Sequence, residues 1–259
     1  MKQLIKPRLL PLLSLAAGIS GLLLQWLLFL LTLDGRGLVA EPHMLHILAL
    51  LIQGAAIAAF IIGVLPLQGH NRYADNYPAS VTGGIGSFAL AAGILLTVPS
   101  RLSIRGNGLV LLWLALGGLT VPCLIFTGVC RLRGKRPAFL FHSVTCLFFA
   151  VQLVLSCQSW SKEPQISTYI FSLLGCIALM LNAYYRAAFD SGIGRRRMQL
   201  FTGLAAGSLC LAALPGSDCP LLLLTGSLWT LTNLCVPEPP RRRRQVEASP
   251  EAPVPTEEA

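Results

Sequence analysis

The stretch LLPLLSLAAGISGLLLQWLLFLLTL, residues 9–33, decides the fold, because 25 consecutive positions contain no charged side chain. A helix needs about 20 apolar residues to cross the hydrocarbon core of a bilayer. The apolar region of a cleaved signal peptide is only about 7–15 residues long, and no small-residue cleavage pattern follows this stretch. We therefore expect residues 9–33 to form a membrane-spanning helix that is retained as an anchor.

Seven further apolar runs follow, separated by turn-forming clusters such as Asn76-Tyr77-Pro78. The runs are continuously apolar, whereas the strands of a membrane β-barrel alternate apolar and polar residues. The sequence therefore predicts an all-α fold, a polytopic transmembrane helix bundle of about eight spans that occupies residues 1–236. The expected spans are residues 9–33, 43–67, 79–99, 108–130, 138–157, 166–185, 198–214 and 220–236.

The composition excludes a soluble domain. Hydrophobic residues make up 54% of the chain, charged residues only 12%, and the mean hydropathy is +0.67. A soluble domain carries about 25% charged residues to cover its surface. The net charge of +9 does not indicate nucleic-acid binding, because the Lys and Arg residues flank the apolar runs and lie beside the lipid headgroups.

The distribution of basic residues predicts the orientation in the cell membrane. With the amino terminus inside and eight alternating spans, 16 of the 20 Lys and Arg residues fall on inner segments and four on outer loops. This asymmetry is what the positive-inside rule expects, and it places both termini in the cytoplasm. Residues 237–259 contain many prolines and no aromatic residue, so we expect a disordered cytoplasmic tail. Its run Arg241–Arg244 either sets the topology or binds anionic lipid.

The polar residues within the apolar runs are mostly amides and hydroxyls, and no charged residue lies near the middle of a run. These amides form a candidate polar pathway for a solute, or they join neighbouring helices by hydrogen bonds. The pathway candidates are Gln53, Gln152, Asn182 and Asn233. Two acidic residues, Asp75 and Asp190, follow Arg72 and Arg186 closely in sequence, and we interpret them as local ion pairs.

A second group of candidates is a predicted outer polar cluster. Imidazole and carboxylate groups are able to hold a transition metal, but the spacing matches no known metal motif, and interfacial histidines explain the pattern equally well. We therefore expect no metal and no organic cofactor. Two cysteines, Cys157 and Cys219, are both expected at the outer surface, which leaves one disulfide open. The outer polar cluster consists of Asp34, Glu41, His43 and His46.

Several short patterns occur twice, in the same order, about 114 to 122 residues apart. Glu41-Pro42 recurs as Glu163-Pro164, and the sequence LAAG at residues 90–93 recurs at residues 204–207. This order predicts two parallel four-helix repeats, although apolar sequence also repeats by chance.

The motifs DGRGL (residues 34–38), YADNYP (73–78) and YRAAFD (185–190), with the order of spans, carry a resemblance. The chain resembles a group of uncharacterised multi-spanning bacterial membrane proteins. The resemblance implies a multi-helix membrane fold and no particular activity.

Three functions remain open at the level of sequence. The first is a non-catalytic membrane component, namely a scaffold, a sensor or a subunit, with a membrane-protein partner or a second copy of the chain. The second is a transporter or channel for a small solute, and the third is an intramembrane enzyme. A polar cavity across the bundle would favour transport, and a closed apolar interior would favour the first function. A pocket with clustered histidine and carboxylate would favour the enzyme.

Overall fold

The computed structural model describes residues 9–32, 44–66, 73, 77, 79–102, 108–160 and 169–234. This part of the chain is all-α, as predicted, with eight α-helices and one 3₁₀ turn. The elements are α1 (Leu9–Thr32), α2 (Met44–Val64), α4 (Val81–Leu102), α5 (Gly108–Leu132), α6 (Phe139–Trp160), α7 (Ile170–Ser191), α8 (Arg196–Ala212), η2 (Leu214–Gly216) and α9 (Pro220–Leu234).

Six of these helices, α1, α2, α4, α5, α6 and α7, are long and apolar enough to cross a membrane. The last two predicted spans also form helices, but α8 has 17 residues and α9 has 15, which is below the usual length of about 20. The prediction of eight spans is therefore confirmed for six candidate spans only. Helix α8 ends at Ala212, before the η2 turn around Pro215, and α9 begins at Pro220 as predicted and is described to Leu234.

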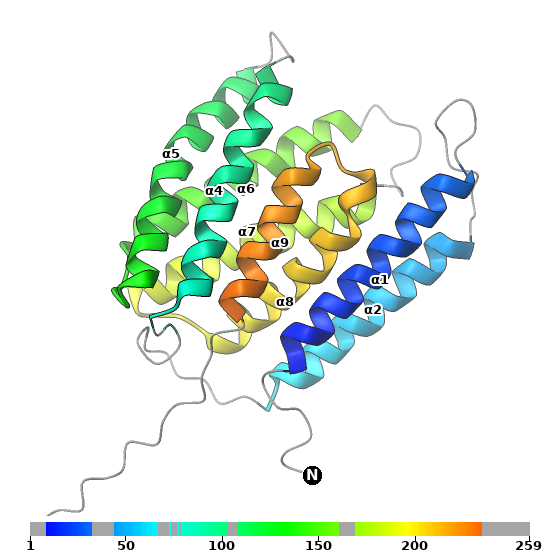
Figure 1. Ribbon diagram of the computed structural model, residues 1–259, viewed down its shortest axis with the longest axis horizontal. Helices are drawn as coiled ribbons and strands as arrows, with labels where there is room; N and C mark the ends of the chain where they lie inside the picture. The colour runs from blue at the N-terminus through cyan, green and yellow to red at the C-terminus, as the bar shows by residue number, and fades with distance from the viewer. Residues whose placement is uncertain are drawn as a thin grey trace, which may run out of the picture.

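Six helices form a closed ring, in which each packs against the next: α4, α5, α6, α7, α8, α9 and again α4 (Figure 1). The hairpin of α1 and α2 lies outside the ring and packs mainly on α8. As a result α8 has neighbours on most sides, and 12 of its 17 residues are buried.

Large apolar side chains fill the middle of the ring. Trp113 of α5 and Phe148 of α6 are fully buried with their ring centroids 5.3 Å apart, and Leu90 and Ile94 of α4 are buried beside them in the same core. Many Leu and Ile side chains on the outer faces of α1, α2, α4 and α5 are exposed, as expected for lipid-facing surfaces. In a bilayer the contact between helices depends on packing rather than on the hydrophobic effect.

The predicted repeat of two four-helix halves is not shown by the structure. Superposing the first half on the second would make α2 and α4 correspond to α7 and α8. The latter two pack along their length, whereas α2 and α4 have no comparable contact (Figure 1). The recurrence of LAAG reflects the frequency of small residues at helix contacts.

The hairpin is held to α8 by close approach of small residues and by one hydrogen bond from α1, and a second hydrogen bond joins α2 to α1 within the hairpin. Ser14 Oγ donates to the backbone oxygen of Leu204 at 2.7 Å, and Gln53 Nε2 donates to that of Ala17 at 2.8 Å. A Cβ atom at Gly18 would lie 2.9 Å from Cβ of Leu211 and 3.2 Å from the Cα atom of Ser208. Only glycine therefore allows α1 and α8 to approach this closely at that position.

We predict that Gly18→Ala lowers the thermal stability of the purified protein. The added methyl group would overpack the contact of α1 with α8, at a cost of about 1–3 kcal/mol. Gly54→Ala is the matched control, because no atom lies within 4 Å of the Cβ position at Gly54. Thermal unfolding in detergent should show a lower midpoint for the first variant and an unchanged or higher midpoint for the second. Equal midpoints would contradict the close packing.

Candidate functional site

Polar side chains gather at one end of the ring, where α5, α7 and α9 end and α4, α6 and α8 begin. Two adjoining hollows of about 320 and 220 Å³ lie there, and they share Tyr77, Arg186 and Asn233. We call the pair the arginine hollow. The other lining residues are Tyr73, Thr127, Arg131, His142, Phe189, Asp190, Arg196, Gln199, Leu200 and Leu234.

Two arginines of the hollow are almost fully buried. Arg131, in the last turn of α5, is 3% exposed, and Arg186, near the end of α7, is 4% exposed. Each guanidinium lies over an aromatic ring: Arg131 is 4.7 Å from the ring centroid of Tyr77, and Arg186 is 4.3 Å from that of Trp229. The faces of both cations are thus stabilised by π electrons, while hydrogen bonds are made by the edges of a guanidinium.

The carboxylate of the hollow is paired with a histidine. Asp190 Oδ2 and His142 Nδ1 are 2.5 Å apart, and both side chains are buried. Arg136 Nη2 donates to the backbone oxygen of Asp190. The prediction of a local ion pair between Asp190 and Arg186 is therefore wrong, because the turn of α7 directs the carboxylate toward α6. The predicted pair of Arg72 with Asp75 lies outside the described residues.

Glycines shape the hollow at two positions. Gly192 adopts φ +91° and ends α7 by donating its N–H to the backbone oxygen of Phe189 at 3.1 Å, which places Asp190 in the final turn. A Cβ atom at Gly83 would lie 3.0 Å from Arg131 Nη2 and 3.1 Å from Asn233 Oδ1. The absence of a side chain on α4 therefore gives these two polar groups their room.

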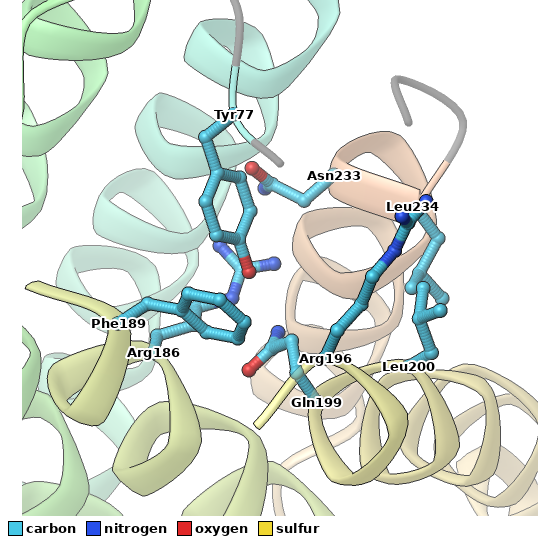
Figure 2. A pocket seen from close by; sticks show the side chains of 8 residues that line it. All are labelled: Tyr77, Arg186, Phe189, Arg196, Gln199, Leu200, Asn233 and Leu234. Carbon is cyan, nitrogen blue, oxygen red and sulfur yellow. The ribbon is translucent and has the colours of Figure 1, made fainter. Parts of the chain in front are cut away.

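Figure 2 shows Tyr77, Arg186, Gln199 and Asn233 directed toward one another from different elements. Asn233 Nδ2 donates to the backbone oxygen of Trp229 at 2.7 Å, so its Oδ1 atom is the one that faces the hollow as an acceptor. Within the described residues, several buried atoms of the hollow have no hydrogen-bond partner. They are His142 Nε2, Arg186 Nε, Asp190 Oδ1, Gln199 Oε1 and Asn233 Oδ1.

The two tyrosines remain neutral hydrogen-bond donors at physiological pH. Burial raises the pKa of Tyr73 to about 12, although the charge of Arg131 opposes the shift. Burial also raises the pKa of Tyr77, against the opposing effect of Arg186 and Arg131. Both hydroxyls therefore stay protonated between the arginines, because phenolate formation would require alkaline pH.

The four amides of the candidate polar pathway do not lie along one path. Asn233 lines the arginine hollow, and Asn182 accepts a hydrogen bond from Gln199 Nε2 at 2.8 Å beside it. Gln53 instead joins α2 to α1, and Gln152 donates to Ser156 Oγ at 3.0 Å within α6. The last two amides therefore make local contacts of the kind that join or stabilise helices.

The predicted outer polar cluster is described only in part. Asp34, Glu41 and His43 lie outside the described residues. His46 Nδ1 is 3.4 Å from Gln25 Nε2, and its ring lies 6.1 Å from that of Phe171. In the described part of the chain no three His, Cys, Asp or Glu residues come together as a metal site would require.

The two cysteines considered for a disulfide are both free thiols. Cys157 is exposed, while Cys219 is buried, where its Sγ atom lies 2.9 Å from Arg101 Nη2. Arg101 is itself 6% exposed and belongs to the end of the ring opposite the arginine hollow.

Most residues of the hollow were not predicted from the sequence, because basic residues at the ends of the apolar runs were interpreted as topology signals. One signal was present. Two of the motifs that carry the resemblance, residues 73–78 and 185–190, supply Tyr73, Tyr77, Arg186 and Asp190 to the same hollow.

Comparisons of the chain with protein-family models, with curated proteins and with solved structures found no match. No family is therefore identified, and the case for function depends on the residues themselves.

We predict that the pair of His142 and Asp190 stabilises the fold. Asp190→Asn should lower the thermal midpoint in detergent, because removing one partner of a buried pair costs about 3–5 kcal/mol. His142→Phe should also lower it, while the double variant should lose less than the sum of the two losses. Additive losses would show that the two side chains do not interact.

Proposed function

We propose that this chain is a non-catalytic membrane component whose helical ring binds a small anionic group in the arginine hollow. The observation that carries the proposal is the charge of the lining: three arginines, Arg131, Arg186 and Arg196, share the hollow with one carboxylate, Asp190. That carboxylate is already paired with His142.

An excess of buried positive charge is costly without a counter-charge. Removing one ion from water costs several kcal/mol even after the protein relaxes, and the cost falls when an opposite charge and hydrogen bonds are supplied. Arg186 lies 4% exposed with its Nε atom unpartnered, and no carboxylate of the described residues lies within ion-pair distance of it. A bound anion would offset this cost.

The geometry of the donors also suits an anion. Arg131 and Arg186 approach from different helices, each oriented by the aromatic ring beneath it. Guanidinium edges bind carboxylate or phosphate oxygens through paired N–H groups, which makes the interaction directional as well as charged. The neutral hydroxyls of Tyr73 and Tyr77 add uncharged donors beside them.

The closed middle of the ring favours binding over transport. Trp113, Phe148, Leu90 and Ile94 fill the space between the arginine hollow and the opposite end of the ring. An anion entering from the arginine end would meet this apolar layer, where a charge is expensive. A sensor or a ligand-binding subunit fits this arrangement better than a channel.

A second candidate is an intramembrane enzyme, favoured by the pair of His142 and Asp190. A carboxylate on Nδ1 orients the imidazole and leaves Nε2 available as an acid or base, the arrangement that general acid–base catalysis uses. His142 Nε2 lines the hollow without a hydrogen-bond partner in the described part of the chain.

We further propose that all eight helices lie within the cell membrane, with both termini and the arginine hollow on the cytoplasmic side. The short α8 and α9 would extend about 25 and 22 Å, at 1.5 Å per residue, and both are embedded among longer helices. The excess of Lys and Arg on the segments at this end supports the orientation.

The orientation predicts which thiols are accessible in intact cells. In variants that keep a single cysteine, Cys157, exposed at the end of α6, should react with an impermeant thiol reagent applied outside. Cys130, near the end of α5, should react only after the membrane is opened. The reverse pattern would place the arginine hollow outside.

The binding proposal predicts that a tetrahedral anion stabilises the protein. Sulfate, titrated at constant ionic strength against chloride, should raise the thermal midpoint in detergent, by an amount equivalent to about 2.7 kcal/mol at a hundredfold excess over Kd. Arg186→Gln should abolish the sulfate effect. Arg101→Gln is the matched control, because Arg101 is equally buried at the opposite end of the ring. A sulfate effect that survives in Arg186→Gln would contradict the site.

A further inference from the structure

The hollow contains acceptors as well as cations. Asn233 Oδ1 is fixed as an acceptor, because Nδ2 of the same amide donates to the backbone oxygen of Trp229. Asp190 Oδ1 is a second acceptor, since the other oxygen of this side chain pairs with His142. Neither atom has a hydrogen-bond partner within the described residues, although both side chains are about 95% buried.

A bare anion would satisfy the cations and leave these acceptors unsatisfied. A buried acceptor without a donor carries a desolvation penalty, and a like-charged ligand oxygen placed beside it would add repulsion. The ligand that removes both costs is negatively charged and also carries a hydroxyl group.

The positions of the two kinds of group fit one small ligand. A Cβ atom on Gly83 would lie 3.0 Å from Arg131 Nη2 and 3.1 Å from Asn233 Oδ1, so the cation and the amide acceptor are neighbours. On the other side, His142, Asp190 and Arg186 line the same 220 Å³ hollow. Donors to a negative oxygen and acceptors from a hydroxyl therefore line the same space.

We propose that the ligand of the arginine hollow is a phosphate that bears a hydroxyl, either hydrogen phosphate or the phosphate of a polyol headgroup. The inference rests on the proposed anion binding and specifies its ligand. The arginines would hold the negative oxygens, and Asn233 Oδ1 would accept the hydrogen bond of the hydroxyl. Asp190 Oδ1 would supply a second acceptor. A simple carboxylate such as acetate carries no hydroxyl, and sulfate at neutral pH has no proton to donate.

The position of the hollow bears on whether the phosphate comes from a lipid headgroup or from a soluble ion. It is at the end of the ring, where helices α5 and α7 end, and in the proposed membrane orientation this end lies at the depth of lipid headgroups. A headgroup of the inner leaflet and a solute of the cytoplasm both reach this depth, and the shared chemistry is the hydroxyl-bearing phosphate.

The test compares inorganic phosphate with sulfate on the full chain in detergent. Each anion is titrated at neutral pH and constant ionic strength, and Kd is obtained from the shift of the thermal midpoint. We expect phosphate to bind about threefold to tenfold more tightly than sulfate, the effect of one additional hydrogen bond. Equal affinities would overturn the hydroxyl inference and leave the anion site intact. Failure of both anions to bind would overturn the proposed function as well.

A single variant tests the role of Asn233 Oδ1 as the acceptor of the hydroxyl. Asn233→Leu should remove the preference for phosphate while retaining the binding of sulfate, because the arginines are unchanged. Gln152→Leu is the matched control. This amide is also buried, but it lies in the second half of α6, away from the arginine hollow. A preference that persists in Asn233→Leu would contradict the role of this oxygen. Because the sulfate titration reports folding of each variant, a misfolded protein is distinguished from one that lost the preference.

A second experiment, in lipid nanodiscs, tests whether the phosphate belongs to a lipid headgroup. Phosphatidylglycerol carries hydroxyls next to its phosphate, and phosphatidylcholine has none in its headgroup. If the source is a headgroup, phosphatidylglycerol nanodiscs should raise the thermal midpoint over phosphatidylcholine nanodiscs and weaken the effect of added phosphate, and Arg186→Gln should abolish both changes. If the source is soluble, inorganic phosphate should stabilise the protein equally in the two lipids. A phosphatidylglycerol effect unchanged in Arg186→Gln would exclude the hollow as the lipid site.

Discussion

A guanidinium ion buried inside a helical bundle needs a compensating charge, and the arrangement of this protein follows from that constraint. Arg131 and Arg186 lie on different helices and point into the same small space. Their faces are covered by Tyr77 and Trp229, which holds the cations without neutralising them. Because the one described carboxylate in that space is paired with His142, the compensating charge is the one that the proposed anion would supply.

The apolar middle of the ring affects the electrostatics of the arginine hollow. Large side chains such as Trp113 and Phe148 fill the interior, and an apolar interior of this kind is expected to exclude water from that side of the cations. The electrostatic attraction for an anion is strengthened by this exclusion of water, because charges interact more strongly where the effective dielectric constant is low. The closed core would therefore strengthen anion binding at the proposed site.

The helices could be predicted from the sequence, and the site could not. Apolar runs of about 20 residues leave few alternatives in a bilayer, so the first six spans were located closely, whereas α8 and α9 form helices that are too short to count among the candidate spans. The arginine hollow depends on which helix ends meet, and that is fixed by the ring contact of α9 with α4, far apart in sequence. Without that contact, Arg131 resembles any basic residue at a membrane boundary. The sequence identified Asn233 as a candidate polar residue, but it did not predict which residues share the hollow with it.

The position of α8 has a consequence for how the protein is made. This helix is enclosed by the hairpin of α1 and α2 on one side and by α7 and α9 on the other. It is short, it begins with Arg196 and Arg197, and few of its residues face outward. A segment of this kind offers little lipid-compatible surface to the insertion machinery. If α8 inserts as proposed, its entry into the membrane relies on contacts with helices that were synthesised earlier, which couples assembly of the bundle to translation.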